Sequence, residues 1–138
     1  MALAPPRLER FARHIVIPEI GGAGQALLAE KHVVLVGLGG IGSPALQYLA
    51  GAGVGQLTLI DDGAVELSNL QRQTIYTTRD IGHGKAVAAR QWLANFDEAL
   101  EVTISDARLD PSNALDHLKG ADLVLDGTDT FATRLAVS

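Results

Sequence analysis

The feature that most constrains this chain is a glycine-rich segment placed directly after a short apolar run. Residues 33–36 are only Val and Leu, which is typical of a strand buried on both faces of a parallel sheet. Four of the next six residues are glycines, in the order Gly37-Leu38-Gly39-Gly40-Ile41-Gly42. Apolar residues then recur at helical spacing over residues 41–50, and a second apolar run covers residues 57–60. The sequence therefore predicts a strand, a tight turn, a helix and a second, parallel strand.

The same alternation continues toward the end of the chain. The predicted elements are a helix over residues 85–96, a strand over 101–104, a helix over 111–118 that starts at a proline, and a strand over 122–125. We expect the apolar side of the first of these helices to consist of Val87, Trp92, Leu93 and Phe96. Alternating strands and helices predict an α/β fold with a Rossmann-like, doubly wound and mainly parallel sheet.

The whole chain, residues 1–138, is predicted to form one domain in two parts. Residues 1–31 form a helical N-terminal segment, and residues 32–138 form the Rossmann-like portion. In the first part a short helix covers residues 26–30, and an amphipathic helix before it is indicated by Leu8, Phe11, Ala12 and Ile15. A further helix begins near residue 131, so we expect the chain to be the N-terminal half of a longer fold.

Composition narrows the class of protein. With 138 residues, of which 47% are hydrophobic, the chain has enough apolar side chains for one globular core. Its net charge of −5 at pH 7 argues against nucleic acid or an anionic membrane surface as a partner. Glycines interrupt the long uncharged stretch over residues 32–60, so we predict no transmembrane helix. The absence of cysteine and of a targeting segment favours a reducing compartment, and the cytoplasm is the expected location.

The glycine segment has a chemical interpretation as well as a structural one. Glycines between a strand and a helix let the backbone approach a phosphate at the helix N-terminus, where free N–H groups favour negative charge. Asp61 closes the second strand, and its carboxylate can accept hydrogen bonds from the ribose of NAD or ATP. The structural alternatives are a tight turn without a ligand and a turn residue at the strand end. These residues alone leave an NAD-dependent oxidoreductase and an ATP-using enzyme both open.

The segment after the second strand distinguishes these two classes. It reads Leu67-Ser68-Asn69-Leu70-Gln71-Arg72-Gln73 and, with four other motifs, resembles the adenylyltransferases that activate ubiquitin-like sulfur carriers. This is the MoeB and ThiF type of enzyme, which serves molybdopterin or thiamine biosynthesis and is related to the ubiquitin-activating enzymes. The other matching motifs are the glycine segment, Arg10 with Arg13, Gly82-His83-Gly84-Lys85, and Asp126-Gly127-Thr128-Asp129 with Arg134.

The resemblance implies that ATP binds in the cleft formed by the four glycines. The C-terminal glycine carboxylate of the carrier protein then attacks the α-phosphorus, giving an acyl-adenylate and pyrophosphate. Arg72 and Lys85 are the matching cations for the triphosphate, because negative charge shifts onto the leaving oxygens. Lys85 stands at a helix start, where a cation is unfavourable without an anion nearby. A solvated surface pair is the alternative interpretation of these two side chains.

The same match assigns roles to three polar residues. Asn69 contacts the phosphates, and Ser68 caps the short turn that presents it. Asp129, beyond the last strand, corresponds to the residue that holds Mg²⁺ near the α-phosphate. The sequence departs from the family at the next position, where Thr130 stands in place of the usual Asn. From the sequence alone, a carboxylate that caps the following helix explains Asp129 equally well.

Arg13 corresponds to an arginine that reaches the triphosphate bound by the other subunit, so the resemblance also implies a homodimer. Without the resemblance, Arg10 and Arg13 are the polar face of an amphipathic helix. The family's later segment carries two Cys-X-X-Cys pairs for zinc, and this chain has no cysteine. An inactive, dimerising scaffold is therefore a further alternative.

Overall fold

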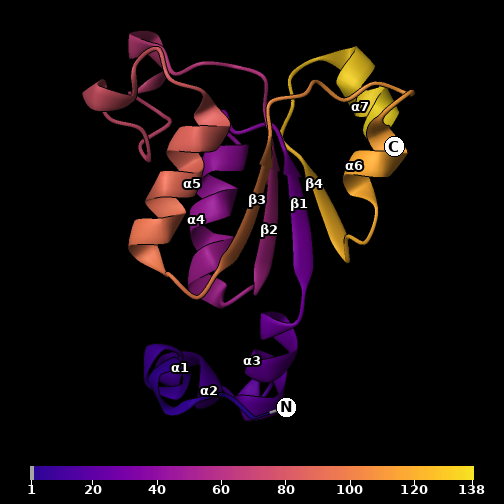
Figure 1. The fold of residues 1–138 in the computed structure, drawn as a ribbon. Helices are drawn as coiled ribbons and strands as arrows, with labels where there is room; N and C mark the ends of the chain where they lie inside the picture. Colours follow the sequence, from indigo (N-terminus) through magenta and orange to yellow (C-terminus); the bar gives the residue numbers. More distant parts are fainter. Residues whose placement is uncertain (1) are drawn as a thin grey trace.

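The computed structural model describes residues 2–138, which form a four-stranded sheet with helices on both faces (Figure 1). Three further helices lie beyond the amino ends of the strands. The strands are β1 (His32–Val36), β2 (Gln56–Ile60), β3 (Glu101–Ser105) and β4 (Leu123–Asp126). The helices are α1 (Pro5–Arg10), α2 (Ala12–Ile15), α3 (Gly21–Ala29), α4 (Gly42–Ala52), α5 (Lys85–Phe96), α6 (Ala114–Leu118) and α7 (Phe131–Val137). Two single 3-10 turns, η1 (Leu67–Asn69) and η2 (Thr78–Asp80), lie between β2 and α5. The predicted α/β, Rossmann-like fold is confirmed.

The strand order decides where a ligand can bind. It is β3-β2-β1-β4, and every neighbouring pair is parallel. The four carboxyl ends therefore lie along one edge of the sheet. From β1 the chain first builds the sheet outward through β2 and β3, and it returns to the opposite side of β1 with β4. In sheets of this kind, ligands bind outside the carboxyl edge at the point where the order reverses.

Each face of the sheet has its own core. Helices α4 and α5 cover one face, and α6 and α7 cover the other (Figure 1). Side chains alternate along a strand, so Leu35 packs on the first face while its neighbours Val34 and Val36 pack on the second. All the residues of β1 and β2 after the first are buried, as predicted for central parallel strands, whereas β3 and β4 contain exposed residues.

Helix α5 has the predicted bounds but a different buried side. Ala86, Ala89 and Leu93 face the sheet and are buried, because small side chains let the helix pack closely against it. Val87, expected on this side, is 50% exposed, and Phe96 is 37% exposed. The predicted apolar side is therefore wrong for these two residues.

Helix α6 begins later than predicted. It starts at Ala114 and not at Pro111, because a hydrogen-bonded turn precedes it. The Asp110 carboxylate accepts hydrogen bonds from the backbone N–H groups of Ser112 and Asn113 at 2.8 and 3.2 Å. These local bonds compete with the helical pattern and hold Pro111 in the turn.

The N-terminal segment is helical, but the predicted amphipathic helix is divided. Phe11, with φ −105° and ψ 17°, separates α1 from α2, and its side chain is 3% exposed. Leu8 is 43% exposed and Ile15 is half-buried, so only part of the expected apolar side is covered. Helix α3 begins at Gly21, ahead of the predicted residue 26. In the part of the chain that is described, no helix is long and apolar enough to cross a bilayer.

Candidate functional site

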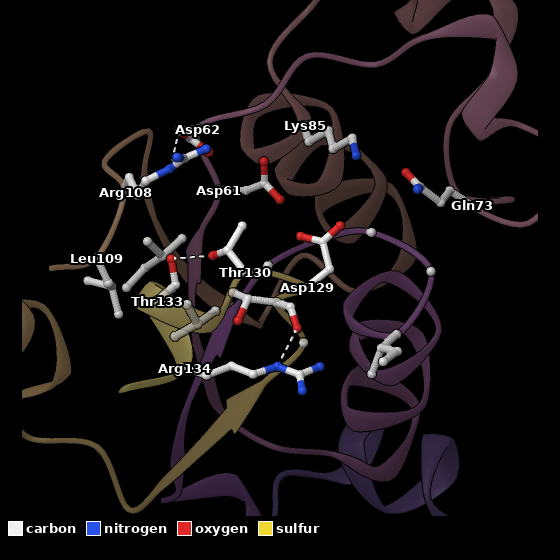
Figure 2. Close-up of a pocket in the computed structure, with 18 of the residues that line it drawn as sticks. Asp61, Asp62, Gln73, Lys85, Arg108, Leu109, Asp129, Thr130, Thr133 and Arg134 are labelled. Atoms are coloured by element: carbon white, nitrogen blue, oxygen red, sulfur yellow. Dashed lines mark hydrogen bonds and ion pairs between the residues drawn. The ribbon is translucent and has the colours of Figure 1, made fainter. Parts of the chain in front are cut away.

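A cleft of about 450 Å³ opens at the carboxyl edge, where the strand order reverses (Figure 2). The loops that follow all four strands line it, because the carboxyl ends of parallel strands converge there. The predicted site residues in this lining are Gly37, Gly39, Gly40, Asp61, Asn69, Arg72, Lys85 and Asp129. Three others, Gly42, Ser68 and Arg13, do not line the cleft.

The glycine segment brings bare backbone to the cleft. Gly37 has a φ of +89°, and backbone atoms of Gly127 lie 3.0 Å from where its Cβ would be. A Cβ on Gly42 would overlap the carbonyl oxygen of Gly37, so Gly42 packs beneath the turn. At Gly40 the Nε atom of Arg72 lies 3.4 Å from where a Cβ would be. A ligand can therefore approach the main chain and the Arg72 guanidinium together.

Two side chains fix the glycine turn through the backbone of Leu38. The Leu38 N–H donates to the Asp61 carboxylate at 2.7 Å, and the Tyr76 hydroxyl donates to the Leu38 carbonyl at 2.8 Å. Burial raises the pKa of Tyr76, and the carboxylates of Asp61 and Asp80 raise it further. Tyr76 thus stays protonated and remains a donor. The other Asp61 oxygen accepts the Gly63 N–H at 2.7 Å.

The loop after β2 presents Asn69 and Arg72. The cap of η1 comes from Asn69, whose side-chain oxygen accepts the Glu66 N–H at 3.0 Å, and from the Glu66 side chain. The expectation that the Ser68 side chain caps this turn is therefore wrong. Ser68 instead accepts a hydrogen bond from Arg72 at its carbonyl, at 3.3 Å. This contact steadies the guanidinium beside Gly40.

Lys85 and Asp129 reach the cleft from opposite sides. Lys85 is the first residue of α5 and is half-buried, and its N–H donates to the Gly63 carbonyl at 3.0 Å. Asp129 follows β4, and in Figure 2 its carboxylate and the Lys85 ammonium point into the same space. With Arg72, these groups surround the glycine turn with two cations and one carboxylate.

Asp129 is a carboxylate that could hold Mg²⁺ only with help from a ligand. Among residues 2–138 no group of three or more His, Cys, Asp or Glu side chains is placed to bind a metal. Mg²⁺ in nucleotide sites is usually held by one or two carboxylates together with substrate phosphates and water. One carboxylate beside two cations therefore fits Mg²⁺ that arrives with a nucleotide.

Comparison with known proteins identifies the family. Residues 11–138, most of the chain, match the model of the ThiF family. The chain belongs to the ThiF family. This confirms the resemblance seen in the sequence motifs, and the NAD-dependent alternative is not favoured.

Two curated relatives and one solved structure illustrate the match. The chain is 44% identical to the probable adenylyltransferase/sulfurtransferase MoeZ of Mycobacterium tuberculosis, over 99% of this chain and 35% of MoeZ. It is 43% identical to the sulfur carrier protein adenylyltransferase of Thermus thermophilus, over 95% of this chain and 48% of that protein. The E. coli tRNA N6-threonylcarbamoyladenosine dehydratase TcdA, solved with ATP, superposes with a TM-score of 0.92 at 28% identity, over 99% of this chain and 56% of that one. The chain thus spans less than half the length of the two curated relatives.

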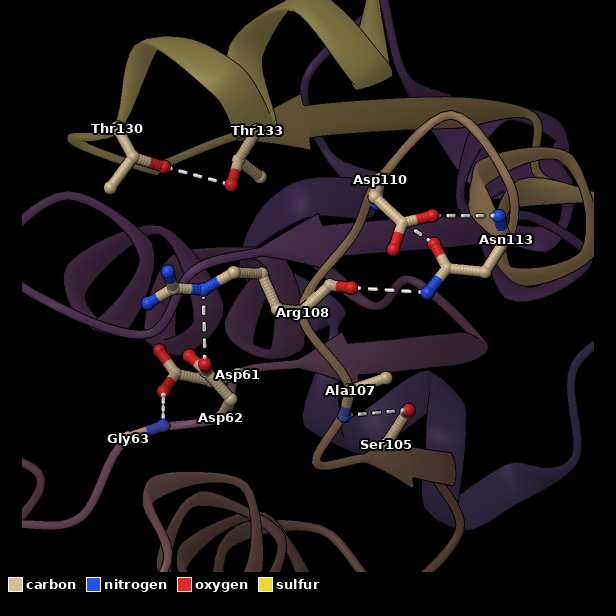
Figure 3. A network of polar contacts seen from close by, with 10 residues as sticks. All are labelled: Asp61, Asp62, Gly63, Ser105, Ala107, Arg108, Asp110, Asn113, Thr130 and Thr133. Carbon is tan, nitrogen blue, oxygen red and sulfur yellow. Dashed lines mark hydrogen bonds and ion pairs between the residues drawn. The ribbon is translucent and has the colours of Figure 1, made fainter.

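Several residues of this ThiF-family cleft escaped the sequence prediction. After β3, Arg108 donates to Asp62 at 3.1 Å (Figure 3), and the buried Leu109 also lines the cleft. After β4, the Thr130 hydroxyl donates to that of Thr133 at 2.8 Å. Thr130, which stands where the family usually has Asn, thus has a local hydrogen-bond partner. The rule that directed attention to Asp61 and Asp129, residues that follow parallel strands, applies equally to the segment after β3 and would have found Arg108.

Arg13 lies far from the cleft of its own chain. It is an exposed residue of α2, which sits beyond the amino edge of the sheet (Figure 1). The cleft is at the opposite, carboxyl edge. Within a single copy of this chain, Arg13 is therefore far from Arg72 and Lys85.

Proposed function

We propose that the cleft binds ATP with Mg²⁺, and that the chain supplies the nucleotide site of an enzyme that adenylylates the C-terminal glycine of a ubiquitin-like sulfur-carrier protein. The observation that carries this proposal is the grouping of Arg72, Lys85 and Asp129 around bare glycine backbone in a ThiF-family chain. Two names support it: TcdA is solved with ATP, and the Thermus relative is called a sulfur carrier protein adenylyltransferase.

The proposed reaction is the transfer of an adenylyl group. One oxygen of the glycine carboxylate forms a bond to the α-phosphorus of ATP. The bond from that phosphorus to the oxygen that bridges to the β-phosphate breaks, and its electron pair leaves with pyrophosphate. The products are an acyl-adenylate and pyrophosphate. Charge accumulates on the leaving oxygens, so cations placed around the triphosphate accelerate the step.

Arg72 and Lys85 supply these cations. The planar guanidinium of Arg72 can make two parallel hydrogen bonds to phosphate oxygens, whereas Lys85 offers a compact, mobile charge. An anion next to Lys85 also removes the unfavourable interaction between its charge and the start of α5. Asp129 would hold Mg²⁺, which when bound offsets further negative charge on the phosphates.

The other predicted residues shape the nucleotide site. The backbone of Gly37, Gly39 and Gly40 lies against the phosphates, and Gly42 contributes by packing beneath the turn. Asn69 contacts the phosphates. Ser68 acts through its carbonyl contact with Arg72. Asp61 accepts ribose hydroxyls while it retains the Leu38 N–H, since a carboxylate has four lone-pair positions.

The active unit in this proposal is a homodimer. Arg13 is remote from the cleft of its own chain, so it acts at the cleft of the partner as an arginine supplied in trans. We place the enzyme in the cytoplasm, in molybdopterin or thiamine biosynthesis.

Exchange of labelled pyrophosphate into ATP tests the function in the enzyme that contains this chain. We expect exchange with a carrier that ends in a free glycine carboxylate and none with the amidated carrier. Arg72→Ala should lower the rate by roughly 100-fold, because one group that stabilises transition-state charge contributes about 3 kcal/mol. Arg79→Ala, an exposed arginine of the same loop, is the control and should leave the rate unchanged. Exchange that is undiminished in Arg72→Ala contradicts the proposal.

A further inference from the structure

Gln73 is a buried residue with an unused hydrogen-bonding atom. Its side chain is 2% exposed, yet its Oε1 has no hydrogen-bond partner. It is the only such buried side-chain atom among residues 2–138. Buried polar atoms in folded proteins are nearly always paired, so an unpaired one needs an explanation. Its backbone N–H is paired, because it donates to the Asn69 carbonyl at 2.9 Å.

The amide lies in the wall of the nucleotide cleft, next to the glycine turn. Its Nε2 atom is 3.6 Å from where a Cβ on Gly39 would be. In Figure 2 the amide points toward the side of the cleft that holds Lys85 and Asp129. Oε1 is shielded in this structure, but the last torsion of a glutamine side chain is soft. A small rotation therefore turns this oxygen toward a group that enters the cleft.

The chemistry of Oε1 limits what that group can be. A carbonyl oxygen only accepts hydrogen bonds, so its partner must be a donor. Phosphate oxygens are acceptors and cannot satisfy it. The donors of ATP are the ribose hydroxyls and the adenine amine. The proposed function places the ribose at Asp61, across the cleft from Gln73 in Figure 2, and adenine is joined to the ribose at C1′, away from the triphosphate on C5′.

The second substrate does carry a suitable donor. Resting on the proposed function, we infer that Gln73 binds the C-terminal glycine of the carrier, accepting a hydrogen bond at Oε1 from the peptide N–H of that glycine. The Gln73 amide nitrogen is a donor and matches the glycine carboxylate, the group that attacks. One carboxamide thus recognises both polar groups of a C-terminal glycine and holds it next to Lys85 and Asp129.

A double-mutant cycle tests this contact. The chain is saturated with Mg²⁺ and an ATP analogue whose α- and β-phosphates are joined by a methylene group, which blocks the reaction. Calorimetry then measures the binding of two short peptides, one ending in Gly-Gly and one ending in Gly-sarcosine. Sarcosine is N-methylglycine, so the second peptide lacks the terminal N–H. The variants are Gln73→Met, which keeps the length of the side chain, and Gln71→Met, an exposed glutamine of the same loop, as control.

We expect the sarcosine peptide to bind the unchanged chain about tenfold more weakly than the glycine peptide. Gln73→Met should weaken binding of the glycine peptide by at least this factor, because it removes both contacts, and should bind both peptides equally. Affinity for the ATP analogue should not change, and Gln71→Met should behave as the unchanged chain. Since Met replaces an unpaired amide, the melting temperature should not fall.

Three results would overturn the inference. One is equal binding of the two peptides by the unchanged chain, which decides the matter alone if Gln73→Met does not fold. Another is a sarcosine penalty that persists in Gln73→Met, because the penalty is then steric. The third is a parallel loss of affinity for the ATP analogue, which would place Gln73 with the phosphate-binding groups. A fourth result, no binding of the ATP analogue by the unchanged chain, would contradict the proposed function itself and, with it, the inference about Gln73. The first three results contradict only the inference about Gln73.

Discussion

The backbone of Leu38 holds the glycine turn in place, although its side chain is apolar. Both of its polar groups are paired, with the N–H donating to Asp61 and the carbonyl accepting from Tyr76. Asp61 therefore has a structural role in addition to the proposed contact with ribose. A substitution of Asp61 would change the turn as well as the nucleotide contact, so its effect cannot be assigned to ribose binding alone.

Two glycines of α4 allow a matched comparison. A Cβ on Gly42 would overlap the carbonyl of Gly37, while nothing lies within 4 Å of a Cβ on Gly51. Gly42→Ala should lower the free energy of unfolding by about 1–3 kcal/mol, the usual cost of overpacking. Gly51→Ala should raise it by about 0.5 kcal/mol, because alanine favours the helix. Urea unfolding measures both, and equal effects would refute the packing assigned to Gly42.

At the scale of elements, one carboxylate joins the N-terminal helices to the rest of the fold. Asp97, just after α5, is paired with Arg7 of α1 at 2.7 Å and lies 3.9 Å from Arg10. The Arg10 guanidinium also lies 5.4 Å from the centre of the Phe96 ring. Burial disfavours the charged form of Asp97, but hydrogen bonds from Arg7 and the Ala99 N–H, with the charges of both arginines, outweigh it and hold its pKa below the usual value for an aspartate.

This pairing predicts an acid-sensitive contact. Because the pKa of Asp97 is lower in the folded state, the unfolded chain binds the proton more readily. The free energy of unfolding therefore falls as the pH drops through the pKa values of Asp97 in the two states. The contribution is present at neutral pH and should be lost progressively below about pH 5. Asp97→Asn should lower stability at pH 7 and reduce the slope of unfolding free energy against pH below pH 5. Glu98→Gln, an exposed neighbour, is the control. A slope unchanged in Asp97→Asn would argue against this contact.

The helices show which structural features a sequence can predict. The bounds of α5 were predictable because Lys85–Phe96 is a continuous helical pattern between Gly84 and Asp97. Its buried side was not, because small alanines rather than the larger Val87 face the sheet. The break at Phe11 depends on contacts with distant residues: a Cβ on Gly53 would lie 3.0 Å from its ring.

The candidate site divides in the same way. Strand-end position and the motif match were sufficient to predict five residues that line one cleft: Asp61, Asn69, Arg72, Lys85 and Asp129. Gln73 lies within the quoted motif, but its unpaired oxygen became visible only with the packing around it. Its importance depends on which atoms surround it, and the sequence does not contain that information.

At the scale of the whole molecule, the remote position of Arg13 leads to a test of the proposed dimer. In the proposed enzyme, Arg13→Ala and Arg72→Ala should each lose most of the activity when tested alone. If Arg13 acts in trans, a heterodimer of the two variants has one site that retains both arginines, so mixing should restore activity. If each Arg13 serves its own subunit, every site in the mixture lacks one arginine. No recovery would then contradict the trans arrangement.

We expect the cleft to be a site for ATP. Calorimetric titration of the chain with ATP and with NAD, each in the presence of Mg²⁺, tests it most directly. The cations Arg72 and Lys85 that follow Asp61 are placed for a triphosphate, so ATP should bind more tightly than NAD. Tighter binding of NAD would show that the cleft is not built for ATP and would restore the oxidoreductase interpretation.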